Sequence, residues 1–299
     1  MCMMITDRYI DPFTDFGFKW LFGTEENKEL LIGFLNDLLD LKDKIVDVKF
    51  RNLEKLGLSI SDRRAIFDIF CIDEKNNNFI VELQRSKQKF FKDRSLYYTS
   101  FPIQEQSKKG DWDYELKKVY FIGILEFNID DNSDNYLTKV KLCDIDSKEV
   151  FYDKLTYYYL EMPKFKKEAN QLSNHLEYWL YMLNNMSKLE RPPTIFKEDK
   201  LLNQAFDLAE FLALDKDRQF AYQQDLKTRL DYKNVMDYAK EEARKEGREE
   251  GREEERIESK KKLKQEKLEI AKNLLDILDI ETISQKTGLT INEIKNLKE

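Results

Sequence analysis

The stretch AIFDIFCIDEKNNNFIVELQ, residues 65–84, decides the fold. Two short apolar runs, residues 65–72 and 79–84, are separated by a polar segment rich in asparagine, and this pattern predicts a β-hairpin. Both faces of both strands are largely apolar. We therefore expect the two strands to be central in a sheet that is covered on both sides.

Three polar side chains interrupt these strands: Asp68 in the first, and Glu82 and Gln84 in the second. In the first strand, alternation places Phe67 and Ile69 on one face and Asp68 on the other. A register that pairs even-numbered with even-numbered residues brings the three polar side chains onto one face, whereas an odd register sends Asp68 to the opposite face. The sequence leaves both registers open.

Two buried carboxylates side by side are costly unless a cation or hydrogen-bond donors compensate them. We therefore expect Asp68 and Glu82 to bind Mg²⁺, with the backbone carbonyl of Leu83 as a further ligand and Mn²⁺ as a substitute. Such a site favours phosphodiester hydrolysis, in which Gln84 orients the attacking water. A permanent arginine partner on either carboxylate would contradict this hypothesis. The competing interpretation is that these are ordinary polar residues of an edge strand.

A cationic segment follows the hairpin directly. Residues 85–109 contain seven basic and two acidic side chains, interleaved with aromatic ones. This composition suits a nucleic acid backbone, so we expect the segment to bind DNA. Its helical spacing runs from residue 88 to Pro102, which should end or kink the helix. Packing within that helix is the alternative role for Arg94, Tyr97 and Tyr98. The basic residues are Arg85, Lys87, Lys89, Lys92, Arg94, Lys108 and Lys109.

The first half of the chain predicts an α/β core that ends near residue 165. A third buried strand after the cationic segment makes that segment a crossover between strands. The expected elements are a helix at 25–41 and strands at 45–50, 118–125, 137–143 and 155–161.

The pattern from residue 168 onward is helical. Residues 240–267 form a nearly neutral charge run with a repeat of arginine every four residues and two glycines, for which we expect a solvated and intermittent helix. Residues 268–299 regain apolar stripes in a helix-turn-helix-like arrangement. We therefore predict four parts: an α/β core at 1–165, a helical subdomain at 166–239, a charged helical linker at 240–267 and the terminal element at 268–299.

Composition excludes several classes of protein. The chain has 299 residues, a net charge of −7, three cysteines and one histidine. These counts exclude a disulfide scaffold, a multi-histidine metal site and histidine-dependent triads. No apolar run approaches the ~20 residues of a membrane helix, and residues 1–15 are not typical of a signal peptide. We expect a cytoplasmic protein.

The order of motifs resembles the recombination-promoting nuclease (Rpn) family, whose members are also described as transposases and belong to the PD-(D/E)XK nuclease superfamily. The matching stretches are TDFGFKWLFG, AIFDIFCIDEKNNNFIVELQ, FFKDRSLYYTS, KKVYFIGIL, YYYLEMPKF, LEYWLYML, EEARKEGREEGREE and IETISQKTGLTINEIKNL. The resemblance extends over nearly the whole chain.

The resemblance implies a restriction-endonuclease-like α/β core with a mixed sheet, followed by an all-helical C-terminal region. It also implies magnesium-dependent DNA cleavage that promotes recombination or a transposition-like reaction. The catalytic acids of the superfamily fall on Asp68 and Glu82, and its lysine position falls on Gln84. Asp15 and Tyr98 are candidate supporting residues.

Two hypotheses follow. The first is a Mg²⁺-dependent DNA endonuclease that acts as a homodimer. This hypothesis includes no organic cofactor and no association with a membrane. The second is a catalytically inert module that binds DNA or protein on a nuclease-like scaffold, which the acidic net charge and Gln84 favour. Calorimetric titration with Mn²⁺ separates them, because the first predicts binding that disappears in Glu82→Ala.

Overall fold

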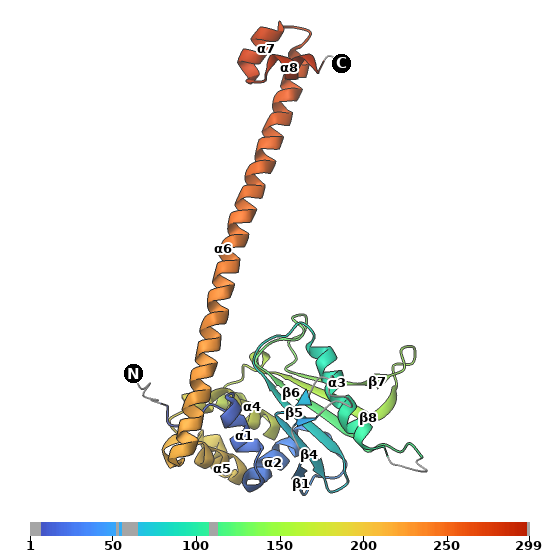
Figure 1. Ribbon diagram of the computed structural model, residues 1–299, viewed down its shortest axis with the longest axis vertical. Helices are drawn as coiled ribbons and strands as arrows, with labels where there is room; N and C mark the ends of the chain where they lie inside the picture. The colour runs from blue at the N-terminus through green and yellow to red at the C-terminus, as the bar shows by residue number, and fades with distance from the viewer. Residues whose placement is uncertain (1–6, 52–53, 56–64, 108–112, 298–299) are drawn as a thin grey trace. The chain divides into compact units, whose positions relative to one another are not determined.

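The computed structural model describes residues 7–51, 54–55, 65–107 and 113–297. In this part of the chain six strands form one mixed sheet, in the order β1-β4-β5-β6-β8-β7, and two short strands pair separately (Figure 1). The sheet strands are β1 (Val48–Phe50), β4 (Ile69–Asp73), β5 (Asn78–Gln84), β6 (Val119–Leu125), β7 (Leu137–Cys143) and β8 (Val150–Glu161). The separate pair is β2 (Glu54–Lys55) and β3 (Ala65–Ile66). The α/β fold class is confirmed.

Strands β4 and β5 form the predicted hairpin. They pair antiparallel, and the polar segment between them turns at Asn76, whose φ of 62° is a conformation that asparagine tolerates. The carboxylate of Asp73 accepts hydrogen bonds from the backbone N–H groups of Lys75 and Asn77 at 2.9 and 2.7 Å, which fixes the turn. Every residue of both strands is buried, so their central position is confirmed.

Strand β5, helix α3 (Phe91–Glu105) and strand β6 form the predicted crossover. Strand β5 pairs parallel to β6, and β6 pairs parallel to β8. Of the two predicted effects of Pro102, an end or a kink of the helix, the end is wrong, because α3 continues to Glu105. The proline lies in the last turn, where its missing N–H removes one helical hydrogen bond, to the carbonyl of Tyr98.

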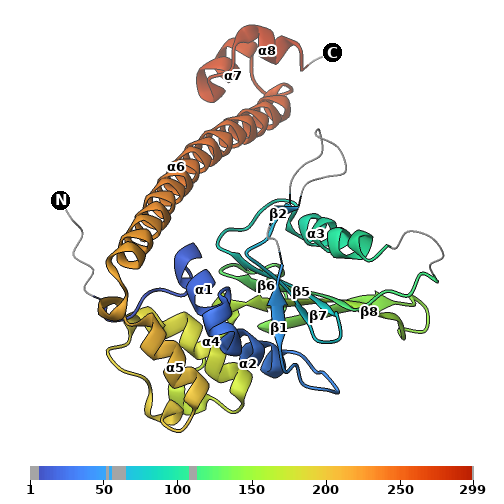
Figure 2. The same ribbon diagram turned by 60° about the horizontal axis from the view of Figure 1, so that its bottom comes forward.

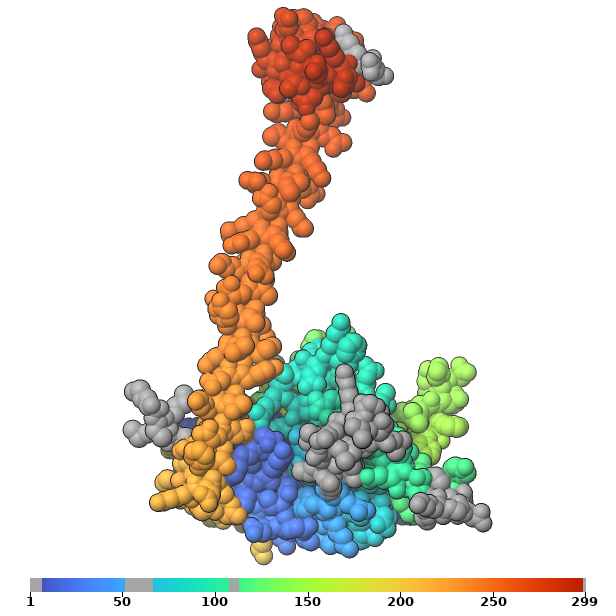
Figure 3. All heavy atoms as spheres, viewed as in Figure 1, coloured from blue at the N-terminus to red at the C-terminus, as the bar shows by residue number. Residues whose placement is uncertain are grey.

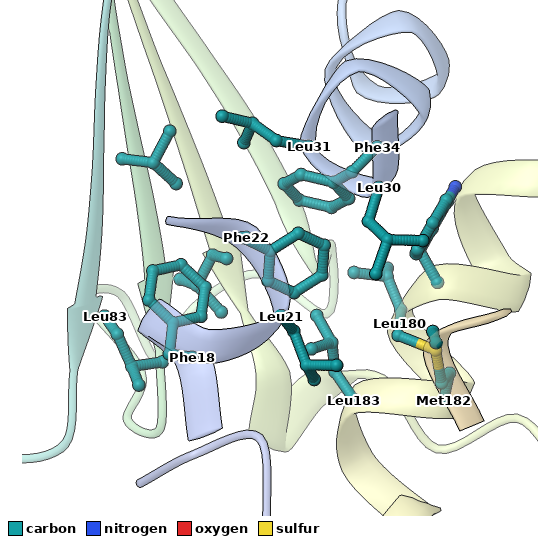
Figure 4. Close-up of a cluster of buried hydrophobic side chains, with 14 of the residues drawn as sticks. Phe18, Leu21, Phe22, Leu30, Leu31, Phe34, Leu83, Leu180, Met182 and Leu183 are labelled. Atoms are coloured by element: carbon teal, nitrogen blue, oxygen red, sulfur yellow. The ribbon is translucent and has the colours of Figure 1, made fainter. Parts of the chain in front are cut away.

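Helices cover both faces of the sheet, with α3 on one face and four helices on the other (Figure 2). Their apolar side chains meet the strands in two separate buried clusters. In the larger cluster Trp179 is fully buried, and its ring centroid lies 6.1 Å from those of Phe22 and Phe34. In the same cluster Phe18 lies beside Leu83 of β5 (Figure 4). The four helices are α1 (Asp15–Phe22), α2 (Lys28–Leu38), α4 (His175–Asn185) and α5 (Lys200–Ala209).

The predicted alternation fails at one residue of the first strand. Phe67 packs with Phe70, with ring centroids 5.4 Å apart, whereas Ile69 belongs to the cluster on the opposite face. The chain bends at Asp68, between β3 and β4. Because a bend interrupts the pleat, the side chains before it change face.

The chain divides into two compact units, Met1–Arg229 and Leu230–Glu299. Helix α6 (Lys216–Leu274) begins in the first unit and is continuous through the charge run, so the expected intermittent helix is wrong. No proline lies in that run, and a helix that has already nucleated needs only propagation. Residues 243–266, orange in the space-filling view of Figure 3, are all exposed, as expected of a solvated helix.

The second unit has a small core of its own. Helices α7 (Ile280–Thr287) and α8 (Ile291–Lys295) bury Ile283 and Ile294 against Ala271 of α6. They and the turn between them lie where the sequence predicts them, whereas the predicted boundaries at 165, 239 and 267 stay predictions. Within the described ranges no helix is both long and apolar enough to cross a membrane.

Candidate functional site

The hairpin register brings the predicted carboxylates together. Phe70 pairs with Ile80 and Ile69 with Val81, so the same register places Asp68, the residue before β4, opposite Glu82. The structure therefore has the even register of the two that the sequence left open.

The two carboxylates accept hydrogen bonds from each other's strand. Glu82 Oε1 accepts from the backbone N–H of Asp68 at 3.2 Å, and Asp68 Oδ2 accepts from the backbone N–H of Leu83 at 2.8 Å. Gln84 Nε2 donates to Glu82 Oε2 at 3.1 Å. Glu82 is 1% exposed and Gln84 is 8% exposed, so the three predicted polar side chains form one largely buried cluster.

The surroundings of this cluster do not favour the ionised form of either carboxyl. Burial, followed by the charge of Asp68, raises the pKa of Glu82 to about 8. Burial also raises the pKa of Asp68, against the hydrogen bond from the N–H of Leu83. Two neighbouring carboxyls that resist ionisation are typical of a site that accepts a cation or a proton.

Arg94 of α3 lies beside the pair. Its Nη2 is 3.6 Å from Glu82 Oε2, and its Nη1 donates to Gln84 Oε1 at 3.4 Å and to Gln88 Oε1 at 2.9 Å. The guanidinium also lies over the ring of Tyr98, 4.8 Å from its centroid. This is the kind of partner that would contradict a metal site. The charge of Arg94 lowers the pKa of Glu82, but burial and the charge of Asp68 outweigh it, so the pKa stays raised.

Helix α1 approaches the same pair. Gly23, which caps α1, lies so close to Ile69 that an added Cβ would be 3.5 Å from the isoleucine side chain. Lys19 of α1 lowers the pKa of both Asp68 and Glu82 by its charge, and Asp15 raises that of Asp68. Lys19 and Asp15 form an ion pair at 2.9 Å. The sequence analysis singled out Asp15 but missed Lys19, although the spacing of four residues on one helix face was a signal for the pair.

The predicted DNA-binding residues between β5 and α3 do not converge on one point. Arg85 lies 3.8 Å from Asp225 of α6, and Lys87 lies 4.0 Å from Asp131. Lys89 lies 5.4 Å from the centroid of the Phe90 ring. Of these predicted residues, Arg94 is the one in contact with the carboxylate cluster. Lys108 and Lys109 lie outside the described residues.

The donor atoms of the cluster fit a hard divalent cation. They are carboxylate oxygens, to which the backbone carbonyl of Leu83 would add a further oxygen, and hard cations prefer such ligands. Among the residues that the structure describes, no group of three or more His, Cys, Asp or Glu side chains is arranged to hold a metal. A bound ion would therefore complete its shell with carbonyl oxygens, water and substrate, as Mg²⁺ commonly does.

Comparison with known protein families gives one match. Residues 12–239 match the PD-(D/E)XK nuclease family transposase, and this range includes the sheet, α3 and the first part of α6. No curated protein and no solved structure matches the chain.

Proposed function

This chain belongs to the PD-(D/E)XK nuclease family transposases, and on that premise we propose that it is a metal-dependent DNA endonuclease. The reaction is phosphodiester hydrolysis in DNA, in the service of recombination or of a transposition-like rearrangement. A homodimer would place one site on each strand of the duplex.

One observation carries the proposal. Asp68 and Glu82 lie opposite each other and are largely buried. Burial raises the pKa of both carboxyls, and the charge of Asp68 raises that of Glu82 further. A fold gains no stability from such a pair, because the desolvation of two like charges exceeds what their hydrogen bonds return. A divalent cation would remove that cost, and the family is one of nucleases.

In the proposed reaction the oxygen of a water molecule bonds to phosphorus and one P–O ester bond breaks. The leaving oxygen takes up a proton, which gives one hydroxyl end and one phosphate end. Asp68, Glu82 and the carbonyl of Leu83 would hold Mg²⁺ or Mn²⁺, which when bound supplies charge neutralisation at the phosphate and activation of water.

The chain's own polar groups hold the parts in place. Gln84 already donates one amide hydrogen to Glu82 Oε2, which fixes the amide beside the carboxylate. Its position suits the orientation of the attacking water, a role for which a neutral amide is sufficient. Asp15 and Tyr98 are supporting residues in this proposal, the first through its pair with Lys19 and the second as the platform beneath Arg94.

The experiment is nicking of supercoiled plasmid by the full chain with Mg²⁺ and with Mn²⁺. Wild type should cleave, and Asp68→Ala should not, whereas Asp146→Ala, which removes an exposed aspartate of the β7–β8 hairpin, should cleave like wild type. Equal cleavage by wild type and Asp68→Ala overturns the proposal.

A calorimetric titration with Mn²⁺ complements the cleavage assay. Wild type should bind the ion and Glu82→Ala should not. Absence of binding to wild type would favour the second function, an inert binding module in which Arg94 is the permanent partner of Glu82.

The DNA path is proposed to follow the segment after β5. Neutralising Lys87 and Lys89 together should flatten the salt dependence of DNA affinity, by a slope of about 0.9 for each lost phosphate contact. An unchanged slope removes these two residues from the interface.

A further inference from the structure

The carboxylate cluster has a neutral residue at the position where the superfamily has a lysine. Gln84 follows Glu82 by two residues on the same strand face, and its amide group is oriented by two contacts. Its Nε2 donates to Glu82 Oε2 at 3.1 Å, while its Oε1 accepts from Arg94 Nη1 at 3.4 Å. The amide therefore connects the carboxylate to a guanidinium that comes from a different element of the fold.

The position of Arg94 is fixed by several partners at once. Gln88 accepts a hydrogen bond from its Nη1 at 2.9 Å, and the ring of Tyr98, one helical turn further along α3, supports the guanidinium at 4.8 Å. The tyrosine itself is buried, with 8% of its surface exposed. An arginine held by a ring, an amide and a carboxylate loses little further freedom when it binds a ligand.

The side chain of Arg94 is also accessible. About a third of it, 32%, is exposed, whereas the Glu82 side chain next to it is 2% exposed. No hydrogen bond joins Arg94 to Glu82 among the described contacts, and the 3.6 Å between Nη2 and Oε2 is a loose ion pair. Arg94 therefore reaches the buried Glu82 carboxylate while part of its side chain stays accessible to solvent, as a residue that contacts a phosphate would require.

We infer that Arg94 is a catalytic residue that supplies the positive charge which Gln84 lacks, by binding a non-bridging oxygen of the phosphate that is cleaved. The inference rests on the proposed nuclease function and deepens it. In hydrolysis of a phosphodiester, negative charge grows on the non-bridging oxygens as water adds to phosphorus. A guanidinium placed beside the metal-binding carboxylates meets that charge with a planar pair of donors.

This role differs from that of the other cationic groups near the site. Arg85 and Lys87 each lie near an acidic residue outside the cluster, Asp225 and Asp131, and neither contacts Asp68 or Glu82 in the described contacts. Their loss should weaken DNA binding. The loss of Arg94 should instead lower the rate at saturating DNA, because it removes an interaction that strengthens in the transition state.

The test compares Arg94→Ala and Arg94→Lys with Arg191→Ala, an exposed arginine outside the cluster, in the full chain. Plasmid nicking is measured at saturating Mg²⁺ over a range of DNA concentrations, and Mn²⁺ binding is measured by calorimetry. We expect Arg94→Ala to lower kcat by about 10²- to 10³-fold, the usual cost of losing one transition-state donor, with a much smaller change in KM. Mn²⁺ binding should stay within about fivefold of wild type, because Arg94 is not a metal ligand and its ion pair with Glu82 is loose, at 3.6 Å.

Arg94→Lys restores the positive charge without the paired N–H donors of the guanidinium, so it should recover part of kcat. Its Mn²⁺ binding should equal that of wild type. Wild-type kcat in Arg94→Ala overturns the inference. Loss of Mn²⁺ binding in both variants also overturns it, because Arg94 would then be a structural support of the carboxylates. If wild type does not cleave, or if Asp68→Ala cleaves as fast as wild type, the proposed function itself fails. The comparison of wild type with Asp68→Ala is sufficient to recognise that outcome.

Discussion

Two buried glutamates in the first unit have opposite surroundings. Glu177, in the first turn of α4, accepts hydrogen bonds from Lys167 at 2.5 Å, from the backbone N–H and hydroxyl of Ser173 at 2.8 and 3.1 Å, and from the Tyr136 hydroxyl at 3.2 Å. Burial raises its pKa, but these donors outweigh burial, so the pKa of Glu177 lies below its ordinary value. Burial and a second carboxylate raise the pKa of Glu82 to about 8.

Glu177 is compensated by donors from its own fold, whereas Glu82 is not, as expected of the ligand-binding carboxylate that we propose. Glu177 connects α4 to the loop before it and to Tyr136, the residue before β7, through cationic and neutral donors. These donors compensate its charge without a ligand. Glu82 has two neutral donors, a loose arginine and a like charge opposite. Burial alone therefore does not mark a functional acid; burial without sufficient compensation does.

The largest expected effect is on the cleavage rate, after substitution of Glu82. Glu82→Gln should lower plasmid cleavage by about a thousandfold, which corresponds to ~4 kcal/mol of transition-state stabilisation, because the metal loses a charged ligand. The melting temperature should not fall, since the variant removes a buried charge. Initial nicking rates and thermal melting measure the two quantities, and a stable variant with the wild-type rate contradicts the assignment.

The next effect concerns stability at the other glutamate. Glu177→Ala should lower the free energy of unfolding by about 3 kcal/mol, because it leaves the Tyr136 hydroxyl and the Ser173 N–H without their acceptor. Urea unfolding measures the change, with Glu198→Ala as the exposed control. Cleavage per folded molecule should match wild type. A variant as stable as wild type would show that Glu177 does not hold the fold.

A smaller effect is the pH dependence of the free energy of unfolding, which the raised pKa of Glu82 should produce. The pKa of Glu82 in the folded chain is about 8, above its ordinary value of 4.5, so between these values the folded state binds more protons than the unfolded state. Stability of the metal-free protein should therefore fall as pH rises through about 8. Asp68→Asn removes the like charge, so it should be more stable than wild type by about 1–2 kcal/mol at pH 9, with little difference at pH 5.

Urea unfolding at both pH values, with and without Mg²⁺, checks this result. Mg²⁺ should raise the stability of wild type at pH 9 and leave Asp68→Asn nearly unchanged. A wild type that becomes more stable from pH 6 to pH 9 would contradict the expected sign.

The smallest effect has the same sign but a different origin. His175 Nδ1 lies 2.8 Å from Asp37 Oδ2, and its Nε2 lies 2.6 Å from Asp199 Oδ2. Burial lowers the pKa of His175, but the two aspartates outweigh it, so the pKa lies above 6.5. The resulting stability is complete below pH 6.5 and is lost as pH rises through the folded pKa.

For this partly exposed pair the loss should be about 0.5 kcal/mol, and it should not depend on Mg²⁺. His175→Gln, compared with wild type between pH 5.5 and pH 8.5, measures it. A difference that Mg²⁺ abolishes would assign the pH dependence to the carboxylate cluster instead.

The sequence predicts the strands and the acids of this site because both depend on local pattern. The apolar runs and the Asn-rich turn are sufficient for the hairpin, and Asp68, Glu82 and Gln84 stand out as polar residues within it. The register depends on the turn at Asn76 and on packing, so two arrangements remained open. Alternation fails at Phe67 because the chain bends at the next residue, which no periodicity indicates.

The partners of the acids could not be predicted in the same way. Arg94 reaches Glu82 because the crossover returns α3 over the sheet face that carries Glu82 and Gln84. Lys19 comes from a helix about fifty residues earlier, and its influence on the pair depends on how α1 packs against β4 and β5. Such contacts between distant segments follow from tertiary packing, which a single sequence does not specify.

The unfavourable environment of Asp68 and Glu82 also has a consequence for sequence variation. Two opposed acids without a cation between them are costly to ionise, so replacing either one by a neutral residue should not weaken the fold. The hairpin, the crossover and the two apolar clusters would survive that loss, since none of them depends on the acids. A sequence that had lost either acid should therefore keep this fold and lack the proposed cation site.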